Sequence, residues 1–277
     1  MSVVLITIED VMKLFKSKFH ATNSINSHSD WFPVHSSSQL AGIVADLMCD
    51  GHLQGEPRWR FDFTSKNIHE LKRFGDEIFS LFNIRGKIRP CTGNKFGRTF
   101  NFGVNCKLLS RTLHLVGVPT GCKVLQEFLI PNWIENEKEC FRTFIRRVFS
   151  CEGTVDISES NPFIGLDMWK AQSLVKNGIE FFKQIKEGLE NFFKIKSTNI
   201  FLSSVSNIRK DGISTRGIRL RIKELNSLIN FKNKIGFQDL IKENKLDKII
   251  FKKRGSQGQY HLGAVSSAWE SNRSLCC

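Results

Sequence analysis

Two stretches of the chain, IVADLMCDG at residues 43–51 and IRRVFSCEG at residues 145–153, share one pattern. Each is an apolar run with helical spacing that ends in Cys, an acidic residue and Gly. In register, the acids Asp50 and Glu152 stand 102 residues apart. An internal match of this kind predicts two copies of one structural unit.

The segments that follow the two acids also match in order. Each acid is followed by an extended run, a helix, two more extended runs and a closing helix that ends before Gly117 or Gly236. These glycines suit left-handed helix ends. In the first half the segments are Trp59 to Thr64, Asn67 to Phe82, Lys87 to Pro90, Thr99 to Asn105 and Cys106 to Val116. In the second half they are Phe163 to Trp169, Ser173 to Phe193, Asn199 to Val205, Gly217 to Ile222 and Glu224 to Ile235.

Alternation of residue types predicts that the strands are apolar on one face and basic on the other. Over residues 58–63, Trp and Phe alternate with Arg and Asp, and over residues 218–223, Ile and Leu alternate with Arg and Lys. Since successive side chains of a strand point to opposite faces, one face packs on helices and the other is basic.

Composition limits the class of protein. The 277 residues contain 41 Lys and Arg against 27 Asp and Glu, a net charge of +14. Such a charge favours nucleic acid as partner, with a merely solvated basic surface as the alternative. No stretch approaches the ~18 consecutive apolar residues that a membrane span needs. Eight cysteines without a CxxC pair indicate thiols in a reducing compartment, and the N-terminus lacks a secretory cleavage pattern. We therefore expect an intracellular, cytoplasmic protein, with an organellar matrix as the alternative.

The two acid-Gly junctions resemble the paired signature helices of single-chain, two-repeat LAGLIDADG homing endonucleases. The resemblance covers roughly residues 37–252. It implies an α+β fold in which two pseudo-symmetric αββαββα repeats pack through their signature helices, and in which antiparallel sheets form a DNA-binding saddle.

The same resemblance divides the chain into segments. The expected boundaries are an N-terminal extension (1–36), a first repeat (37–118), a linker (119–136), a second repeat (137–252) and a flexible C-terminal tail (253–277). Within the extension we expect one amphipathic helix, Ile8 to Phe19, and a Ser cap before the first signature helix. The apolar middle of the linker is expected to pack beneath the sheet.

The chemistry is expected at the two acids. Phosphodiester hydrolysis benefits from a divalent metal, and Mg²⁺ prefers carboxylate, phosphate and water oxygens. An anion at a helix C-terminus also calls for a compensating cation. By resemblance, Asp50 and Glu152 each bind Mg²⁺ at one of two active sites, with the backbone carbonyls of Gly51 and Gly153 completing the shells, and Mn²⁺ or Ca²⁺ could occupy the same sites. The alternative is that both are ordinary polar helix ends at turns.

Two lysines are candidate catalytic residues, because a cation near the scissile phosphate stabilises the transition state. By resemblance, Lys66 and Lys170, at the ends of corresponding strands, lie near the two cleavage centres, and Gln172 is a weaker addition. The alternative is that both lysines are simply solvated.

Cations on the polar strand faces and in two hairpin loops, Pro90 to Arg98 and Asn207 to Gly217, are candidate DNA contacts. They are Arg58, Arg60, Arg85, Lys87, Arg89, Lys95, Arg98, Arg209, Lys210, Arg216, Arg219 and Arg221.

The helix interface is expected to contain small residues spaced four apart. Ala45 and Cys49 supply them on the first helix, whereas the second offers Arg147 and Cys151. Arg147 implies a wider crossing or a side chain that reaches out of the interface. We expect Asp46 to pair with Arg146 or Arg147, the alternative being an Asp that faces solvent.

The sequence thus predicts a site-specific homing endonuclease that makes metal-dependent double-strand breaks at a long asymmetric DNA site and acts as a monomer. The chain begins with Met and ends Ser-Leu-Cys-Cys, so we expect it to be free-standing and intron-encoded. The alternatives are an RNA-splicing maturase that binds intron RNA, or a DNA-binding regulator on the same scaffold. A basic structural protein without a nucleic-acid site would leave the repeated junctions unexplained.

Overall fold

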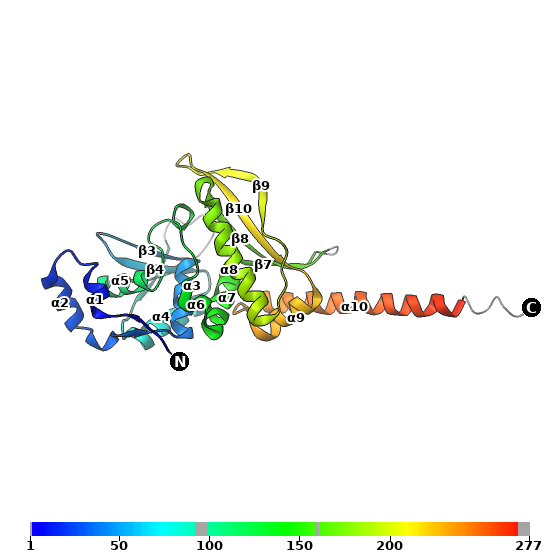
Figure 1. The fold of residues 1–277 in the computed structure, drawn as a ribbon, viewed down its shortest axis with the longest axis horizontal. Coiled ribbons are helices and arrows are strands. Elements are labelled where there is room, and N and C mark those ends of the chain that lie inside the picture. Colours follow the sequence, from blue (N-terminus) through cyan, green and yellow to red (C-terminus); the bar gives the residue numbers. More distant parts are fainter. Residues whose placement is uncertain (1, 92–98, 159–160, 271–277) are drawn as a thin grey trace, which may run out of the picture.

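A computed structural model describes residues 2–91, 99–158 and 161–270, with residues 256–270 given as backbone only. Two copies of one unit make up most of the structure (Figure 1). Each unit follows the order helix, two strands, helix, two strands, helix. The prediction of an α+β fold with two αββαββα repeats is therefore confirmed.

The first repeat forms a four-stranded antiparallel sheet in the order β3-β4-β6-β5. Its elements are α3 (Ser38–Met48), β3 (Gly51–Gln54), β4 (Arg60–Ser65), α4 (Ile68–Phe82), β5 (Lys87–Pro90), β6 (Phe100–Val104) and α5 (Lys107–Leu115). Phe61, Phe63 and Phe102 are buried on one face of the sheet, where their rings contact Phe74 of α4. The alternation predicted for β4 is therefore present, and α4 covers its apolar face.

The second repeat has a sheet of the same connectivity, β7-β8-β10-β9. Its elements are α7 (Lys138–Glu152), β7 (Gly153–Asp156), β8 (Phe163–Ala171), α8 (Val175–Phe193), β9 (Phe201–Ile208), β10 (Ser214–Ile222) and α9 (Leu225–Lys234), with a 3₁₀ turn, η3 (Gln172–Leu174), before α8. Ile218, Leu220 and Ile222 are fully buried on the face of β10 that packs against α8.

The helices α3 and α7 pack against each other at the centre of the molecule, and both sheets lie on the same side of this pair (Figure 1). Ser37 caps α3 by accepting a hydrogen bond from the amide of Leu40, as expected from the sequence. Every residue of α3 from Leu40 to Met48 is buried. This apolar helix can bury its whole surface only at the centre of a fold, which accounts for its position.

The N-terminal extension lies at one end of the molecule, against α5 of the first repeat (Figure 1). It contains β1 (Val4–Ile6), α1 (Ile8–Met12), α2 (Lys18–Asn26), the 3₁₀ turn η1 (Ser29–Trp31) and β2 (Val34–His35), which pairs with β1. The single helix expected from Ile8 to Phe19 is wrong. Ser17 caps a new helix, so the chain turns between α1 and α2.

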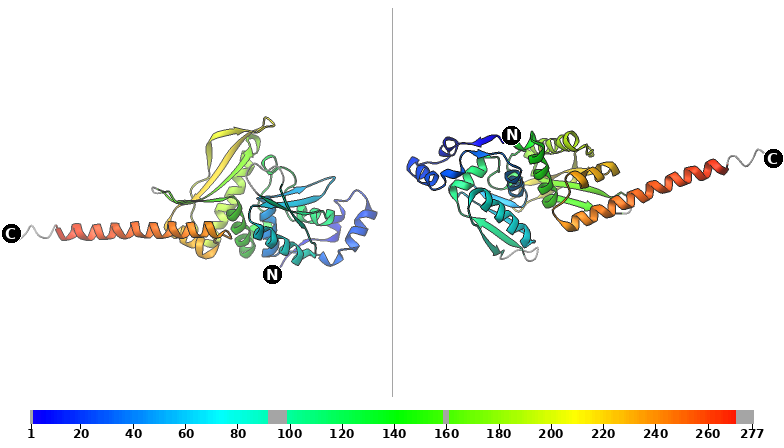
Figure 2. Two further views of the ribbon diagram at one scale, coloured as in Figure 1. Left: turned by 180° about the vertical axis from the view of Figure 1, so that it is seen from behind. Right: turned by 90° about the horizontal axis from the view of Figure 1, so that it is seen from below.

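At the other end, α10 (Leu240–Glu270) first packs against α9 and β7 and then projects away from both repeats (Figure 2). The expected flexible tail from residue 253 is therefore helical as far as Glu270. No proline interrupts residues 240–270. Ile249 and Ile250 are the last buried residues of the helix before residue 256. Within the described residues, no helix combines the length and the apolar character that crossing a bilayer demands.

Several short elements differ from the sequence prediction. The residue pattern does not predict the strands β3 and β7, because each has only four residues and a single large apolar side chain, Leu53 or Val155. The expected loop from Asn207 to Gly217 is mostly strand, since β9 and β10 extend to Ile208 and from Ser214. The other expected loop, Pro90 to Arg98, lies largely outside the described residues, as do Lys95 and Arg98 within it.

Candidate active site and nucleic-acid interface

Asp50 and Glu152 lie at the C-terminal ends of the two packed helices α3 and α7, where each helix gives way to the first strand of its sheet. Both side chains are open to solvent. Surrounding protein nevertheless raises the pKa of each carboxyl group, and the negative charge of Asp50 raises the pKa of Glu152 further. The structure therefore brings the two predicted acids together at one centre between the sheets.

Two lysines that the sequence analysis did not single out also reach this centre. The ammonium group of Lys123, in the linker turn η2 (Lys123–Leu125), contacts the carbonyl oxygens of Cys49 and, at 2.6 Å, Gly51. Lys242 of α10 does the same for the other helix, with its Nζ atom 2.5 Å from the carbonyl oxygen of Ser150. The pKa of each lysine is lowered by burial, which the nearby acids partly offset.

The two lysines hold matching positions in the repeats. Lys123 and Lys242 each follow the left-handed glycine at the end of the closing helix, Gly117 or Gly236, by six residues. Carbonyl groups at a helix C-terminus have no intrahelical partner and carry partial negative charge, so a lysine stabilises them. This repeated spacing was the signal in the sequence that could have identified both residues.

The resemblance implies a divalent metal at the acids, and the donor groups fit one. Asp50 and Glu152 offer carboxylate oxygens on one open surface, and Mg²⁺ is commonly held by one or two carboxylates with water and substrate phosphates as the other ligands. The described residues contain no group of three or more His, Cys, Asp or Glu able to enclose a metal by themselves. The carbonyl oxygen of Gly51, an expected metal ligand, accepts a hydrogen bond from Lys123. Gly153 begins β7, and Lys242 contacts the preceding carbonyls of residues 149–151.

Lys66 and Lys170 do not form the matched pair that the sequence suggested. Gly51 pairs with Phe63 and Gly153 pairs with Leu166, so Phe63 and Leu166 are equivalent positions in the two sheets. Lys66 lies three residues after Phe63, whereas Lys170 lies four residues after Leu166. Lys66 lies just past the end of β4, so only Lys170 belongs to a face of its sheet. Lys66 is exposed between β4 and α4, whereas Lys170 is within β8 and fully buried.

Lys170 instead anchors the linker. Its Nζ atom donates hydrogen bonds to the carbonyl oxygens of Lys123, at 3.0 Å, and Gln126, at 2.6 Å, and lies 3.6 Å from the ring centre of Phe128. Phe128 is buried against Phe181 of α8, as expected for the apolar middle of the linker. Lys170 is thus a positioning residue for the turn that carries Lys123.

Replacing Lys170 with Met is expected to lower the free energy of unfolding by about 1–3 kcal/mol, because two carbonyl groups lose their buried donor. We also expect DNA cleavage to fall more than DNA affinity, since the turn that carries Lys123 loses its anchor. Denaturant unfolding, DNA binding and cleavage rate measure the three effects. Lys66→Met is the matched control and should leave all three unchanged. The reverse result, with Lys66 needed and Lys170 dispensable, would contradict this assignment.

The helices α3 and α7 approach each other closely at both ends of their interface. A side chain added at Gly42 would meet Thr143 and Arg147 of α7 at 3.3 and 3.4 Å, so a glycine makes room for the Arg. Nearer the acids, Ala45 and Cys49 of α3 are buried in the interface. The long side chain of Arg147 is thus accommodated inside the interface, and it does not reach out to solvent.

Arg147 belongs to a buried cluster of charges that joins three helices. Asp46, 1% exposed, lies 2.9 Å from Arg73 of α4 and 3.7 Å from Arg147. Arg147 also contacts Glu77 of α4 at 2.5 Å, and Arg73 contacts Glu77 at 3.0 Å. Arg146, the other partner considered for Asp46, is exposed and donates to the carbonyl oxygen of Phe237 at 3.4 Å. The proposed pairing of Asp46 therefore holds for Arg147, with Arg73 as its closer partner.

Predicted DNA contacts of the first repeat gather on the polar face of its sheet. Arg60, Arg85, Lys87 and Arg89 line one groove of ≈ 460 Å³, together with the polar side chain of Asn101. The guanidinium of Arg85 lies 4.1 Å from the ring centre of Phe79, which holds it in place. Arg58 is exposed in the turn before β4. The groove therefore gathers four of the predicted cations on one surface.

The predicted contacts of the second repeat are held by neighbours of their own. Arg219 lies 3.2 Å from Asp167, and Arg221 stacks on Phe163 with 4.2 Å to the ring centre. Arg209 pairs with Asp211 at 3.0 Å, beside the exposed Lys210. Arg216 differs from the expectation: it pairs with Lys170 in the β8–β10 register, so it belongs to the opposite face from Arg219 and Arg221.

Comparison with curated proteins finds partial similarity to three with different names. The chain is 28% identical over 176 residues to the replication factor C small subunit of Methanocaldococcus jannaschii. It is 22% identical over 247 residues to glutamine–fructose-6-phosphate aminotransferase of the same organism, and 28% identical over 185 residues to the tRNA-splicing ligase RtcB of Methanopyrus kandleri. These matches cover 58%, 89% and 61% of this chain but span only 10%, 20% and 18% of the relatives. No family model matches the chain.

Similar solved structures include the DNA-bound homing endonuclease I-WcaI, with a TM-score of 0.48, 10% identity and coverage of 88% of this chain and 98% of that one. They also include the N-terminal LAGLIDADG domain of DUF199/WhiA, with a TM-score of 0.45, 13% identity and coverage of 77% and 88%.

Proposed function

We propose that this chain is a DNA endonuclease of the LAGLIDADG type that makes metal-dependent breaks in both strands of a long duplex site. The observation that carries the proposal is the placement of Asp50 and Glu152 at matched ends of two packed helices, between two sheets. Ordinary helix-end acids would not need to recur at one centre with a half-buried lysine beside each. The basic groove of the first repeat adds a surface for the phosphate backbone.

Each group has a role in this proposal. Asp50 and Glu152 hold Mg²⁺, which would activate water and neutralise charge on the scissile phosphate when bound. Mn²⁺ or Ca²⁺ suits the same oxygens. Lys123 and Lys242 fix the carbonyl ends of α3 and α7 and place positive charge where the phosphate gains negative charge.

The setting of the enzyme is also a proposal. Both repeats lie in one chain, so a monomer is expected to contact both half-sites, in the cytoplasm or in an organellar matrix. Similar segments occur as small parts of three proteins with unrelated names, which supports a mobile module more than a shared metabolic role. We also propose that the gene is intron-encoded.

The direct test uses DNA that carries the joined flanks of the element encoding this gene. We expect double-strand cleavage by the purified protein in Mg²⁺ and none in EDTA. Salt-dependent binding without cleavage would instead favour a DNA-binding regulator, and preferential binding of intron RNA would favour a maturase. Absence of nucleic-acid binding would reject the whole proposal.

Replacing Lys87 with Gln should weaken DNA binding roughly equally for all sequences and reduce the slope of log affinity against log salt by about 1. Lys87 lines the groove of the first repeat, where it can contact phosphate. Lys72→Gln is the matched control, because Lys72 is exposed on α4 beneath the sheet. Fluorescence anisotropy at several salt concentrations measures both. Equal slopes for the two variants would remove the groove from the interface.

A further inference from the structure

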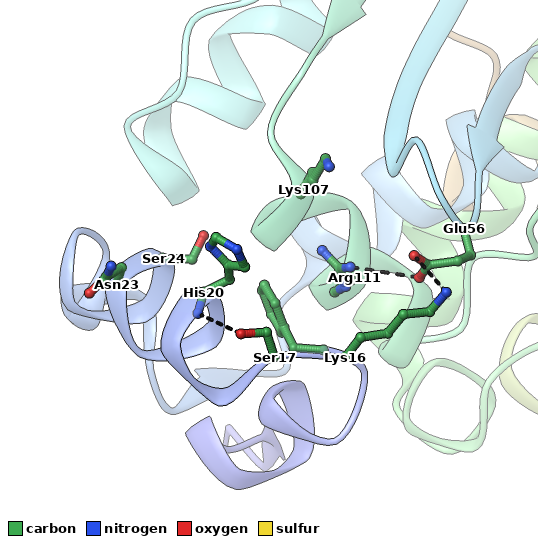
Figure 3. A pocket seen from close by; sticks show the side chains of 9 residues that line it. Lys16, Ser17, His20, Asn23, Ser24, Glu56, Lys107 and Arg111 are labelled. Carbon is green, nitrogen blue, oxygen red and sulfur yellow. Dashed lines mark hydrogen bonds and ion pairs between the residues drawn. The ribbon is translucent and has the colours of Figure 1, made fainter.

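A second concave site lies between the N-terminal extension and the first repeat (Figure 3). This pocket of ≈ 510 Å³ is lined by residues from the start of α2, from α5 and from the turn between β3 and β4. Ser17 and His20 come from the first turn of α2, whose amide groups favour an anion. Lys107 and Arg111 of α5 and Lys16 of the extension supply positive charge.

Arg111 is the residue that makes this pocket suited to an anion. The residue is 5% exposed, and its Nη1 atom has no hydrogen-bond partner among the described residues. Its Nε atom donates to the carbonyl oxygen of Leu14 at 3.2 Å, and its guanidinium stacks on Phe15 at 4.0 Å and on Trp59 at 4.9 Å. A buried guanidinium held this firmly with one free edge is suited to bind an anion.

The pocket contains more positively charged than negatively charged side chains. Glu56 is 3.8 Å from both Arg111 and Lys16, which is long for an ion pair, and it accepts its close hydrogen bond, at 2.8 Å, from the indole of Trp59. Three cations thus share a single carboxylate in the part of the pocket that the structure describes (Figure 3). A phosphate group matches this surplus of charge and the forked geometry of Arg111.

Residues that line the pocket lie close along the chain to residues that line the basic groove of the first repeat. Asn105 lines the groove and Lys107, two residues later, lines the pocket. The β3–β4 turn makes a second connection, with Glu56 in the pocket and Arg60 in the groove. A DNA strand that follows the groove can therefore place a further phosphate at the pocket.

We propose that this pocket binds a backbone phosphate of the duplex beyond the first-repeat sheet, so that the N-terminal extension lengthens the DNA footprint. This inference rests on the proposed function, because it assumes that the groove binds DNA. It assigns a role to an extension that lies outside both repeats and contributes nothing to the paired acids.

The test compares two duplexes, one that ends at the first-repeat edge of the site and one that is about one helical turn longer on that side. Lys16→Gln/Lys107→Gln removes two exposed cations of the pocket and leaves buried Arg111 in place. Lys13→Gln/Lys138→Gln is the matched control, since it makes the same change in charge at exposed positions outside the pocket. We expect the pocket variant to lose about five- to tenfold in affinity for the long duplex at ~0.1 M salt and to bind the short duplex like the control.

Equal affinity losses on both duplexes, or a loss no larger than that of the control, would overturn the inference. A thermal shift with inorganic phosphate separates the other outcomes. If millimolar phosphate stabilises the wild type but not the pocket variant, while duplex length has no effect, the pocket binds free phosphate and the DNA assignment is wrong. If the wild type binds neither duplex, the proposed function fails, and the phosphate measurement reports on the pocket alone.

Discussion

Replacing Asp50 with Asn, or Glu152 with Gln, is expected to lower the rate of double-strand cleavage by on the order of 10²–10³-fold, leaving at most a nick in one strand. Each change keeps the shape of the side chain but removes the negative charge that would hold Mg²⁺. Affinity for the duplex should be retained or rise slightly, because a negative charge near the phosphates is lost. Supercoiled plasmid cleavage separates intact, nicked and linear products in one gel.

The control for this pair is Asp76→Asn, which removes the charge of an exposed acid on α4. It should cleave like the wild type. If either acid variant still produced linear DNA at the wild-type rate, the acids would be ordinary helix ends. The proposed endonuclease would then lose the observation that carries it.

Replacing Arg147 with Ala is expected to lower the free energy of unfolding by about 3–5 kcal/mol. The change leaves Asp46 and Glu77 in the interface with Arg73 as their remaining close cation. Denaturant titration measures the loss, and Arg146→Ala is a matched control one residue away, because Arg146 is exposed. We expect the control to stay within about 0.5 kcal/mol of the wild type. Equal effects for the two variants would show that the cluster adds no stability.

The loss in Arg147→Ala should also depend on pH. Burial raises the pKa of Asp46 and of Glu77 to about 7, against the opposing effect of Arg73. A carboxyl group with a raised pKa binds its proton more tightly in the folded state, so its contribution to stability is lost as pH rises through about 7. Without Arg147, this effect should grow. The variant is therefore expected to be more strongly destabilised at pH 8 than at pH 5.5, and Glu77→Gln in the same background should reduce the difference.

The sequence predicted the repeat architecture because its strongest signals are local. The apolar run of α3, the matching acid-Gly junctions and the alternation in β4 and β10 each reflect periodicity that one segment carries by itself. The strands β3 and β7 lack such a signal. Their four residues are set by pairing with β4 and β8, which no local pattern records.

The site was predicted less completely than the fold. Asp50 and Glu152 could be identified because they sit inside the repeated motif. Lys123 lies in the linker and Lys242 in the helix that follows α9, and apart from their equal spacing from Gly117 and Gly236 no local pattern marks them. The burial of Lys170 was not predicted for a different reason. The strand β8 extends two residues beyond its expected end, which places the Lys170 side chain on the apolar face of the sheet.

The attachment of the linker has a consequence for the order in which the site forms. Lys123 serves the first repeat, yet its backbone is held by Lys170, and the following linker residues Phe128 and Ile130 are bonded to Asn177 and Gln184 of α8. During synthesis, the first repeat leaves the ribosome before any of these partners exists. The half of the centre that contains Asp50 can therefore form only after the second repeat has folded. The half that contains Glu152 differs, because its lysine, Lys242, follows the second repeat's own strands and helices. A gene split after the linker would yield a first fragment that contains Asp50 and Lys123 but lacks Lys170, so only reassociation with the second fragment would hold the turn that carries Lys123 in place.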